Sequence, residues 1–575
     1  MELLINQVGY ECDGEKSALL QCGADLDIRG HVRLLRQQDD HLLLETPLVA
    51  AGCVPGWQGR HYWRADFSAF TEPGHYRLEA VVTTGAQERL VRSPSFAIGR
   101  GLLARRCLSD VIHYFKGQRA SGTFDRADRR ARLFGTDQRR DVHGGWFDAS
   151  GDMSKYLSHL SYANYLNPQQ TPMVVWSLLK CRELLATRRD IDGMNLCKRL
   201  NDEGLHGADF LCRMQDESGF FYMTLFDKWS KDPEQRELCA YATQQGIKSA
   251  RWQAGFRQGG GMTIAALARA AREPSGGDLD TSQYAEAARR GYLHLREHNL
   301  AYLDDGVENI IDDYCALLAA VELTRTLGAE WLAEARDRAG RLCARQRAHP
   351  DLGHHWAAND DGSRPYYHAA EAGLPVLALL EYLAIEPDPA RQWAARTVAE
   401  QALAAELALA ARAGNPFALA RQYVKGVDEA PRVSFFMPHH NESGYWWQGE
   451  NARLASLATM AFAAAQHLPG QSALLCTFGQ QQLDWILGRN PFNACMLAGQ
   501  GINNPEYTAG YPNAQGGICN GITAGFDDEN DVAFIPEAYK DRLDQNWRWG
   551  EQWIPHAAWF ALAITWQSAQ GGHHD

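Results

Sequence analysis

Hydrophobic and polar positions follow two different patterns along this chain, and the change comes near residue 99. Up to that point, short apolar runs of strand length, such as 31–36, 75–82 and 95–98, are separated by turns of Gly, Pro and Asp. Runs of this length and spacing are typical of a small β-sandwich. No cluster of acidic or histidine residues interrupts them, so we expect residues 1–98 to form a structural sandwich domain.

After residue 99, apolar residues recur every three to four positions, which is the spacing of a helix with one buried face. Stretches with this pattern lie near 102–118, 171–188, 195–214, 259–273, 280–299, 312–328, 330–347, 367–384, 388–412, 449–467, 470–487 and 555–569. This series of helices, with no convincing strand between them, predicts helical hairpins arranged in a ring or a solenoid. The periodicity does not choose between the two, although the lack of a strict repeat consensus weakens the solenoid.

Several connections between the predicted helices are long and rich in Gly, Trp, Asn and His. These connections are 119–170, 215–258, 349–366, 414–448 and 488–554. Long loops in a compact domain usually carry function. If the helices form a barrel, we expect these loops to cluster on one rim and to build a cleft.

Composition limits the class of protein and its partners. The chain has 575 residues, 45% hydrophobic and 22% charged, which indicates a globular protein larger than one ordinary domain. The formal net charge of −13 argues against nucleic acid or an anionic membrane surface as a partner, because both are polyanions. The 13 cysteines never show C-x-x-C spacing, which indicates reduced thiols. With no visible signal peptide and no apolar stretch of bilayer length, we expect a cytoplasmic protein.

Two carboxylates stand four residues apart in a loop of small residues at 144–156. Asp148 and Asp152 lie among Gly, Ser and Ala, with Trp146 and Tyr156 on either side. Small residues let the backbone turn sharply and bring side chains close to a ligand. Aromatic faces beside acids suit a sugar, which has apolar C–H faces and a rim of hydroxyls. The alternative is a surface turn with two solvated acids, and the loop alone does not distinguish the two.

A glutamate near the C-terminus, Glu551, stands among four tryptophans and just before a predicted helix. Burial against aromatic rings raises the pKa of a carboxyl group because it disfavours the charged form. A glutamic acid that stays protonated near neutral pH is what a glycosidase needs to protonate a leaving oxygen. The alternative is a glutamate stabilised by the dipole at the start of that helix. With the aspartate loop, Glu551 would supply the acid and the base that glycoside hydrolysis requires.

Several motifs occur in the order found in one enzyme family. Gly-Gly-Trp-Phe-Asp-Ala-Ser-Gly-Asp at 144–152 is similar to the signature Gly-Gly-Trp-Tyr-Asp-Ala-Gly-Asp of glycoside hydrolase family 9, and Glu551 resembles the acid glutamate of that family. Ile-Asn-Gln-Val-Gly-Tyr at 5–10 resembles the opening strand of the immunoglobulin-like module that precedes many of its catalytic domains. Further similar segments are 312–320, 445–447 and 487–491.

This resemblance implies a multidomain fold, with an immunoglobulin-like β-sandwich over 1–98 and an all-α (α/α)6 barrel over 99–575. It also implies hydrolysis with inversion at the anomeric carbon. By position, Asp152 matches the base that activates water, Asp148 matches the neighbour that helps to hold this water, and Glu551 matches the acid. The base and acid of an inverting enzyme should lie roughly 6.5–9.5 Å apart.

Two departures from the family pattern bear on the substrate. The inserted Ser150 places the aspartates four positions apart instead of three, so the loop must bulge to aim both at one water. The segment 503–517 lacks the His-His-Arg with which cellulases of the family contact cellulose. The aspartate loop and the segment 549–559 resemble the bacterial exo-β-D-glucosaminidases, which predicts release of glucosamine from the non-reducing end of chito-oligosaccharides. The alternatives are a β-glucosidase or cellobiase, an endoglucanase on β-1,4-glucans, and a non-enzymatic sugar-binding scaffold.

The remaining candidates concern substrate contacts and metals. We expect the substrate to contact Trp146, Tyr156, Glu442, Trp446, Trp447, Glu450 and Trp553. The tryptophans at 446–447 either stack on a sugar ring or pack in the barrel, since Trp serves both uses. The histidine pairs at 354–355, 439–440 and 573–574 lack zinc-ligand spacing. The sequence therefore predicts no metal and no cofactor, a small soluble oligosaccharide as partner, and leaves the oligomeric state open.

Overall fold

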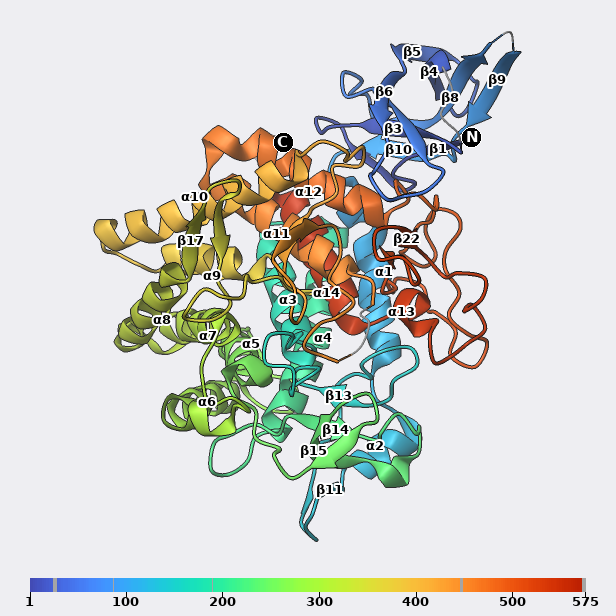
Figure 1. The fold of residues 1–575 in the computed structure, drawn as a ribbon. Coiled ribbons are helices and arrows are strands. Elements are labelled where there is room, and N and C mark those ends of the chain that lie inside the picture. Colours follow the sequence, from blue (N-terminus) through green and yellow to red (C-terminus); the bar gives the residue numbers. More distant parts are fainter. Residues whose placement is uncertain (24–27, 86, 189, 445–447, 571–575) are drawn as a thin grey trace.

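The computed structural model describes residues 1–575 except 24–27, 86, 189, 445–447 and 571–575, and it contains a β-sandwich followed by a larger helical domain (Figure 1). One sheet of the sandwich has the strand order β1-β3-β7-β6, and the other has the order β2-β10-β8-β4-β5, with β9 paired to β8. The strands are β1 (Glu2–Leu4), β2 (Gly9–Glu11), β3 (Ser17–Cys22), β4 (Ile28–Arg36), β5 (Leu42–Pro47), β6 (Val49–Gly52), β7 (His61–Asp66), β8 (Gly74–Thr84), β9 (Gln87–Arg92) and β10 (Phe96–Gly99). The predicted sandwich is confirmed.

The core of the sandwich lies between its two sheets. Val32 and Leu34 in β4 are buried, whereas His31 and Arg33 reach solvent, which is the pattern of a strand with one face in the core. Tyr10 packs edge-to-face against Phe67 and Phe96, with ring centroids 5.4 and 5.6 Å away. Such large aromatic side chains fill the space between the two sheets, whose short strands contribute few core residues each.

The long helices of the described chain form two concentric rings. In the inner ring α3, α5, α7, α9, α11 and α14 pack in that order, and α14 closes the ring against α3. Each outer helix packs against an inner one: α1 on α14, α4 on α3, α6 on α5, α8 on α7, α10 on α9 and α12 on α11. Their bounds are α1 (Leu102–Gln118), α3 (Thr171–Leu185), α4 (Ile191–Arg213), α5 (Gly261–Ala270), α6 (Thr281–Tyr302), α7 (Ile310–Leu327), α8 (Leu332–Ala344), α9 (Leu374–Leu383), α10 (Pro389–Ala410), α11 (Asn451–His467), α12 (Ser472–Ile486) and α14 (Ile554–Gln570). This arrangement is an (α/α)6 barrel, so the helices form the ring and not the solenoid.

The two rings differ in how much of each helix is buried. The inner helices α11 and α14 are buried along most of their length and are rich in alanine, which lets neighbouring helices approach closely. The outer helices α6 and α8 keep a polar face toward solvent, as expected of amphipathic helices. Within the described residues, no helix combines the length and hydrophobicity that crossing a membrane requires.

The connections between helices contain a six-stranded sheet, so the expectation of no strand there is wrong. Its order is β12-β11-β15-β14-β13, with β16 paired to β15. The strands are β11 (Ala131–Leu133), β12 (Arg139–Arg140), β13 (Lys155–Tyr156), β14 (Thr224–Phe226), β15 (Glu237–Ala242) and β16 (Ile247–Ser249). Strands this short show no visible alternation in the sequence. Since β13 forms the last two residues of the aspartate loop 144–156, this sheet holds that loop in place.

Shorter elements complete the connections. Three small hairpins pair β17 with β18, β19 with β20, and β21 with β22. Their bounds are β17 (Gln346–His349), β18 (Gly353–Trp356), β19 (Gln422–Val424), β20 (Arg432–Ser434), β21 (Thr523–Ala524) and β22 (Val532–Ala533), and the short helices are α2 (Gly122–Asp128) and α13 (Trp547–Gly550).

The sandwich contacts the barrel through the motif at 5–10. The side-chain amide of Asn6 donates a buried hydrogen bond of 2.9 Å to Oδ1 of Asp484 on α12. The backbone amide of Gln7 donates to the carbonyl oxygen of Leu487, also at 2.9 Å. Buried polar groups are costly unless they are paired, so these bonds fix the orientation of the sandwich on the barrel.

Candidate active site

A cavity of about 370 Å³ lies where three of the long connections meet. Its wall takes residues from the connections 119–170, 215–258 and 488–554, which confirms for these three the expectation that they build one cleft. The lining residues are Gly151, Asp152, His159, Leu160, Tyr162, Trp229, Lys231, Tyr241, Thr243, Gln244, Tyr507, Leu543, Asp544, Trp547, Glu551 and Trp553. Two of the three predicted catalytic carboxylates, Asp152 and Glu551, are among them.

Asp152 is held in the cavity wall by three hydrogen-bond donors. The backbone amide of Ser154 donates to Oδ1 at 2.9 Å, and the hydroxyl of Tyr156 and the indole of Trp229 donate to Oδ2 at 2.7 and 3.1 Å. Burial and the nearby Asp227 raise the pKa of Asp152, whereas the bonds from Tyr156 and Ser154 lower it. The donors therefore fix the direction of the carboxyl group and favour its charged form.

The loop that carries Trp229 is strained. Trp229 and Lys231 have φ values of 56° and 59°, in the left-handed region that costs a residue other than glycine roughly 1–3 kcal/mol. The carboxylate of Asp227 offsets this cost, because it accepts from the backbone amides of Trp229 at 2.9 Å and Lys231 at 3.0 Å. The strain is thus held at the residue that orients Asp152.

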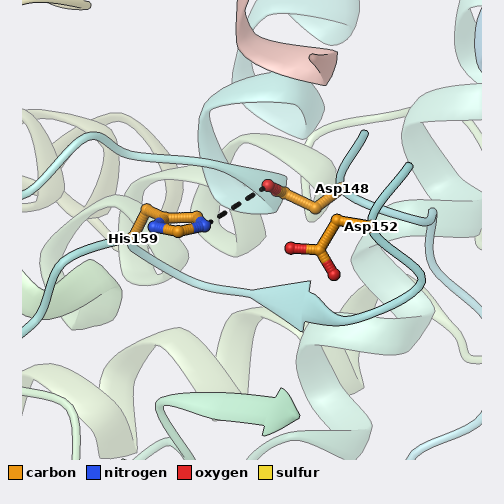
Figure 2. Close-up of side chains that lie close together, drawn as sticks. All are labelled: Asp148, Asp152 and His159. Atoms are coloured by element: carbon orange, nitrogen blue, oxygen red, sulfur yellow. Dashed lines mark ion pairs between the residues drawn. The ribbon is translucent and has the colours of Figure 1, made fainter. Parts of the chain in front are cut away.

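Asp148 lies deeper than Asp152 and has no exposed surface. Neither of its carboxyl oxygens has a hydrogen-bond partner among the described residues, and Nε2 of His159 is 3.9 Å from its Oδ2 (Figure 2). Burial raises the pKa of Asp148 well above its ordinary range, and the charges of Asp152 and Glu551 act in the same direction. Buried polar atoms without a protein partner are usually satisfied by ordered water, so a water molecule is the expected partner of Asp148.

Glu551 is held by a donor on each carboxyl oxygen. The backbone amide of Gly151 donates to Oε1 at 3.0 Å, and the indole of Trp553 donates to Oε2 at 2.7 Å. Burial and the charge of Asp152 raise the pKa of Glu551 from its ordinary value of 4.5 to about 8. The carboxyl group is therefore protonated at neutral pH, as its tryptophan neighbours indicate.

The loop of Asp152 and the segment of Glu551 are joined directly, although they are far apart in the sequence. Ala149 and Asp152 exchange backbone hydrogen bonds of 3.3 Å across a tight turn. Within this turn, the amide of Ser150 donates to the carbonyl oxygen of Gln552 at 2.9 Å, and the hydroxyl of Ser150 accepts from the amide of Gln552 at 3.0 Å. The inserted residue thus forms the turn that ties one acidic segment to the other.

The cavity wall contains residues that the motifs did not single out. Among these are His159, Trp229, Tyr241 and Tyr507, together with the charged Lys231 and Asp544. All of them lie in connections that were expected to carry function. Nothing in their spacing distinguishes them from the many other aromatic and polar residues of those connections.

Two of the predicted substrate contacts lie away from the cavity space. Trp146 has no exposed surface, and its indole donates to Glu203 at 3.2 Å in the helical core. Tyr156 is also fully buried, and its hydroxyl reaches Asp152. Neither side chain is among the residues that line the cavity, because an aromatic residue beside an acid in the sequence can face the protein interior, and substrate contact stays a prediction for both. Tyr156 orients the acid from behind.

Two predicted acidic contacts form ion pairs within the protein. Glu450 is buried, pairs with Arg453 and accepts from the amide of Met437 at 2.7 Å, and it is not among the residues that line the cavity, so its contact with substrate stays a prediction. Glu442 pairs with Arg364 and is not among the residues that line the cavity. Each acid is thus paired with an arginine, and for the buried Glu450 such a partner is needed to offset the loss of solvation.

Of the other predicted substrate contacts, one lies in the cavity wall and two lie in a segment that the structure does not describe. Trp553 lines the cavity, and its ring lies 4.9 Å from that of His159. Trp446 and Trp447 lie outside the described residues.

Asp148, Asp152 and His159 offer three possible metal-ligand atoms, all within 4.8 Å of one another (Figure 2). Carboxylate oxygens and imidazole nitrogens are ligands of divalent transition metals. That the protein uses no metal stays a prediction.

Comparison with known proteins bears on the family. The model of glycosyl hydrolase family 9 matches residues 105–509, and that of the cellulase N-terminal ig-like domain matches residues 1–84. Among curated proteins, none matches the chain. The predicted family and the predicted N-terminal domain are both confirmed by these matches.

Two solved structures are similar along nearly the whole chain. A metagenome-derived glycoside hydrolase family 9 endoglucanase is similar over 99% of both chains, with 20% identity and a TM-score of 0.67. The family 9 endoglucanase J30 is similar over 97% of this chain and 99% of its own, with 17% identity and a TM-score of 0.64. At such identities the likeness shows a shared fold. Because the family model covers most of the chain, this protein belongs to glycosyl hydrolase family 9 and is a glycoside hydrolase with an N-terminal immunoglobulin-like domain.

Proposed function

We propose that this glycoside hydrolase cleaves a β-1,4-linked oligosaccharide with inversion, with Glu551 as the acid, Asp152 as the base and Asp148 as its helper. The observation that carries the proposal is a pair of buried carboxyl groups in different environments at one cavity. Asp152 accepts three hydrogen bonds that hold it in place, whereas the pKa of Glu551 is about 8. When their environments push the pKa values of two titratable groups apart, one group can act as the acid and the other as the base.

In the proposed reaction, Glu551 gives its proton to the glycosidic oxygen as the bond from that oxygen to the anomeric carbon breaks. A water molecule held by Asp152 and Asp148 attacks the same carbon from the opposite face and gives a proton to Asp152. The product sugar leaves with inverted configuration, and the enzyme holds a charged Glu551 and a protonated Asp152. Exchange of protons with solvent restores the starting state.

A β-1,4-glucan is the first candidate substrate. Support comes from the two similar solved structures, which are named endoglucanases. Further support comes from the aromatic side chains of the cavity, among them Trp229, Trp547 and Trp553, because such rings suit the apolar faces of a sugar.

Glucosamine at the non-reducing end of a chito-oligosaccharide is the second candidate. It is favoured by the inserted Ser150 and by the missing His-His-Arg at 503–517, where this chain departs from the cellulases it resembles. Besides the protonated Glu551, the described lining contains the acids Asp152 and Asp544 against a single lysine, Lys231. A protonated amino sugar would gain charge-assisted hydrogen bonds from such carboxylates.

A substrate panel tests the two candidates. Purified protein is incubated with cellotetraose, cellobiose, chitobiose and fully deacetylated chitobiose, and the products are separated by size. Release of glucosamine from the deacetylated substrate alone would support the second candidate. Cleavage of cellotetraose with no release of glucosamine would support the first and refute the second.

Two variants and the product anomer test the roles. We expect Asp152→Ala and Glu551→Gln to lower kcat by about 10³-fold or more with the fold retained, because each removes one side of the proton transfer. Glu371→Gln is the matched control, since Glu371 is a buried carboxyl with a pKa near 8 that does not line the cavity. Proton NMR should detect the α-anomer as first product. A β-anomer would exclude inversion, and full activity of either variant would exclude its assigned role.

A further inference from the structure

His159 is a buried histidine in the cavity wall to which the proposed reaction assigns no part. Its side chain is 7% exposed, and its ring lies between those of Tyr156 and Trp553, with centroids 4.2 and 4.9 Å away. One of these neighbours orients the proposed base and the other binds the proposed acid. The ring is therefore fixed between the two halves of the site.

The hydrogen bonds around His159 decide which ring nitrogen carries the hydrogen. The hydroxyl oxygen of Tyr241 accepts from the backbone amide of Leu160 at 3.3 Å and lies 2.7 Å from Nδ1 of His159. We assign the hydroxyl as the donor in this bond, because a hydrogen on Nε2 then faces the carboxyl oxygens of Asp148 and Asp152, whereas a lone pair there would be repelled by them. Burial lowers the pKa of His159 to about 3, so the ring is neutral at neutral pH and its one hydrogen lies on Nε2.

This Nε2–H group faces the two aspartates and has no hydrogen-bond partner among the described residues (Figure 2). It lies 3.9 Å from Oδ2 of Asp148, which is too far for a direct hydrogen bond. One oxygen from each of Asp148 and Asp152 and one nitrogen of His159 all lie within 4.8 Å of one another. Two hydrogen bonds of about 2.8 Å that meet near the tetrahedral angle join atoms about 4.6 Å apart. The three groups are thus spaced to share one water molecule.

A water molecule suits this set better than a cation does. A metal ion would need the lone pair of Nε2, whereas the bond from Tyr241 leaves a hydrogen there. Water can accept from that hydrogen and give its own two hydrogens to the carboxylates of Asp148 and Asp152. Nε2 of His159 and one of the two unpartnered oxygens of Asp148 then have a partner, which buried polar groups favour.

We propose that His159 is a third positioning residue for the attacking water, whose oxygen accepts the Nε2–H of His159 while its hydrogens go to Asp148 and Asp152. The inference rests on the proposed function, because it assigns this water to the inverting reaction. One lone pair of the water is bound by His159, so the other is left for the anomeric carbon. Tyr241 acts one step further away by keeping the hydrogen of His159 on Nε2.

The first test separates kcat from KM. We expect His159→Ala to lower kcat by about 100-fold with KM changed less than about threefold, since a misplaced reactant slows the chemical step more than binding. His159→Gln should recover part of the loss, because an amide N–H can donate in place of Nε2–H. Tyr241→Phe, which keeps the ring, should lower kcat by about tenfold through loss of the preferred tautomer.

His368→Gln is the matched control for these variants. His368 is also buried, its pKa is also lowered to about 3, and its Nε2 also has no partner among the described residues, but it does not line the cavity. We expect this variant to keep the kcat of the wild type. Thermal unfolding of all the variants checks that each is folded.

A β-glycosyl fluoride of the sugar found in the substrate panel gives the sharper test. Fluoride leaves without protonation, so Glu551→Gln should regain activity on it, whereas His159→Ala should stay about 100-fold impaired because water still has to attack. Recovery of His159→Ala on the fluoride would overturn the inference, and so would a raised KM with unchanged kcat. If Asp152→Ala were also fully active, the proposed function itself would fall, which distinguishes the two failures.

Discussion

Replacing Trp553 with phenylalanine would remove one N–H group from the site while keeping an aromatic ring beside His159. That N–H donates to Oε2 of Glu551 at 2.7 Å and lowers the pKa of the carboxyl, which burial and Asp152 raise to about 8. A hydrogen bond to a charged group contributes about 1.5–3 kcal/mol, and 1.36 kcal/mol corresponds to one pKa unit. Since the protonated acid also accepts this bond, the difference between its two forms is smaller, and we expect a rise of about one unit.

The sign of the effect follows from the role of Glu551 as an acid. The group works while protonated, so kcat/KM falls as the pH rises through its pKa. Trp553→Phe should therefore displace the basic limb of the pH profile to higher pH by about one unit. The assay is kcat/KM measured from about pH 5 to about pH 10 on the best substrate of the panel.

Trp566→Phe supplies the control, because it makes the same chemical change at an indole without a hydrogen-bond partner among the described residues. Its pH profile should match that of the wild type. A basic limb of Trp553→Phe that stays in place or moves to lower pH would show that Glu551 does not act as the acid under this hydrogen bond.

Three further predictions concern the aspartate loop 144–156 and the barrel interior. Gly151→Ala should lower kcat by about 100-fold in steady-state assays, because the added Cβ would lie 2.7 Å from Oε1 of Glu551 and displace the acid; activity within twofold of wild type would contradict this. Tyr156→Phe removes a donor that lowers the pKa of Asp152, so the acidic limb of the profile should move up by about one unit, and an unmoved limb would count against Asp152 as the base. Burial raises the pKa of Glu371 from 4.5 to about 8, so the folded protein binds more protons than the unfolded chain in this window and loses stability as the pH rises through it. Glu371→Gln removes this dependence. Between pH 5 and pH 8, denaturant curves should show that the free energy of unfolding falls by about 3 kcal/mol less in the variant than in the wild type.

The helices were predictable from the sequence because each presents a long apolar face. The apolar spacing near 102–118 and 388–412 marks α1 and α10 within a few residues. Periodicity describes each helix alone, however, and says nothing of which helix closes the ring. That decision depends on the packing of α14 against α3, two elements from opposite ends of the domain.

The acids of the site could be found from motifs, whereas their partners could not. Asp152 and Glu551 stand in distinctive local sequences, but Trp229 reaches Asp152 only because β13 pairs with β14 and brings two distant connections together. The same limitation explains Trp146, which is next to the acids in sequence and turned into the helical core. Local sequence shows which residues are near an acid along the chain, and only the fold shows which face it.

The contact between the turn at Ser150 and the C-terminal segment also determines when hydrolytic activity can first appear while the chain is being synthesised. A ribosome must add about 400 more residues after Gly151 before Glu551 exists to accept its amide hydrogen, and α14 must then follow to complete the inner ring. Under the proposed roles, nascent chains that stop before this point carry the base without the acid and should hydrolyse no sugar. Contacts of such long range also form slowly, because closing a long loop costs entropy before any contact compensates it. The onset of activity during refolding would therefore report the last step of folding.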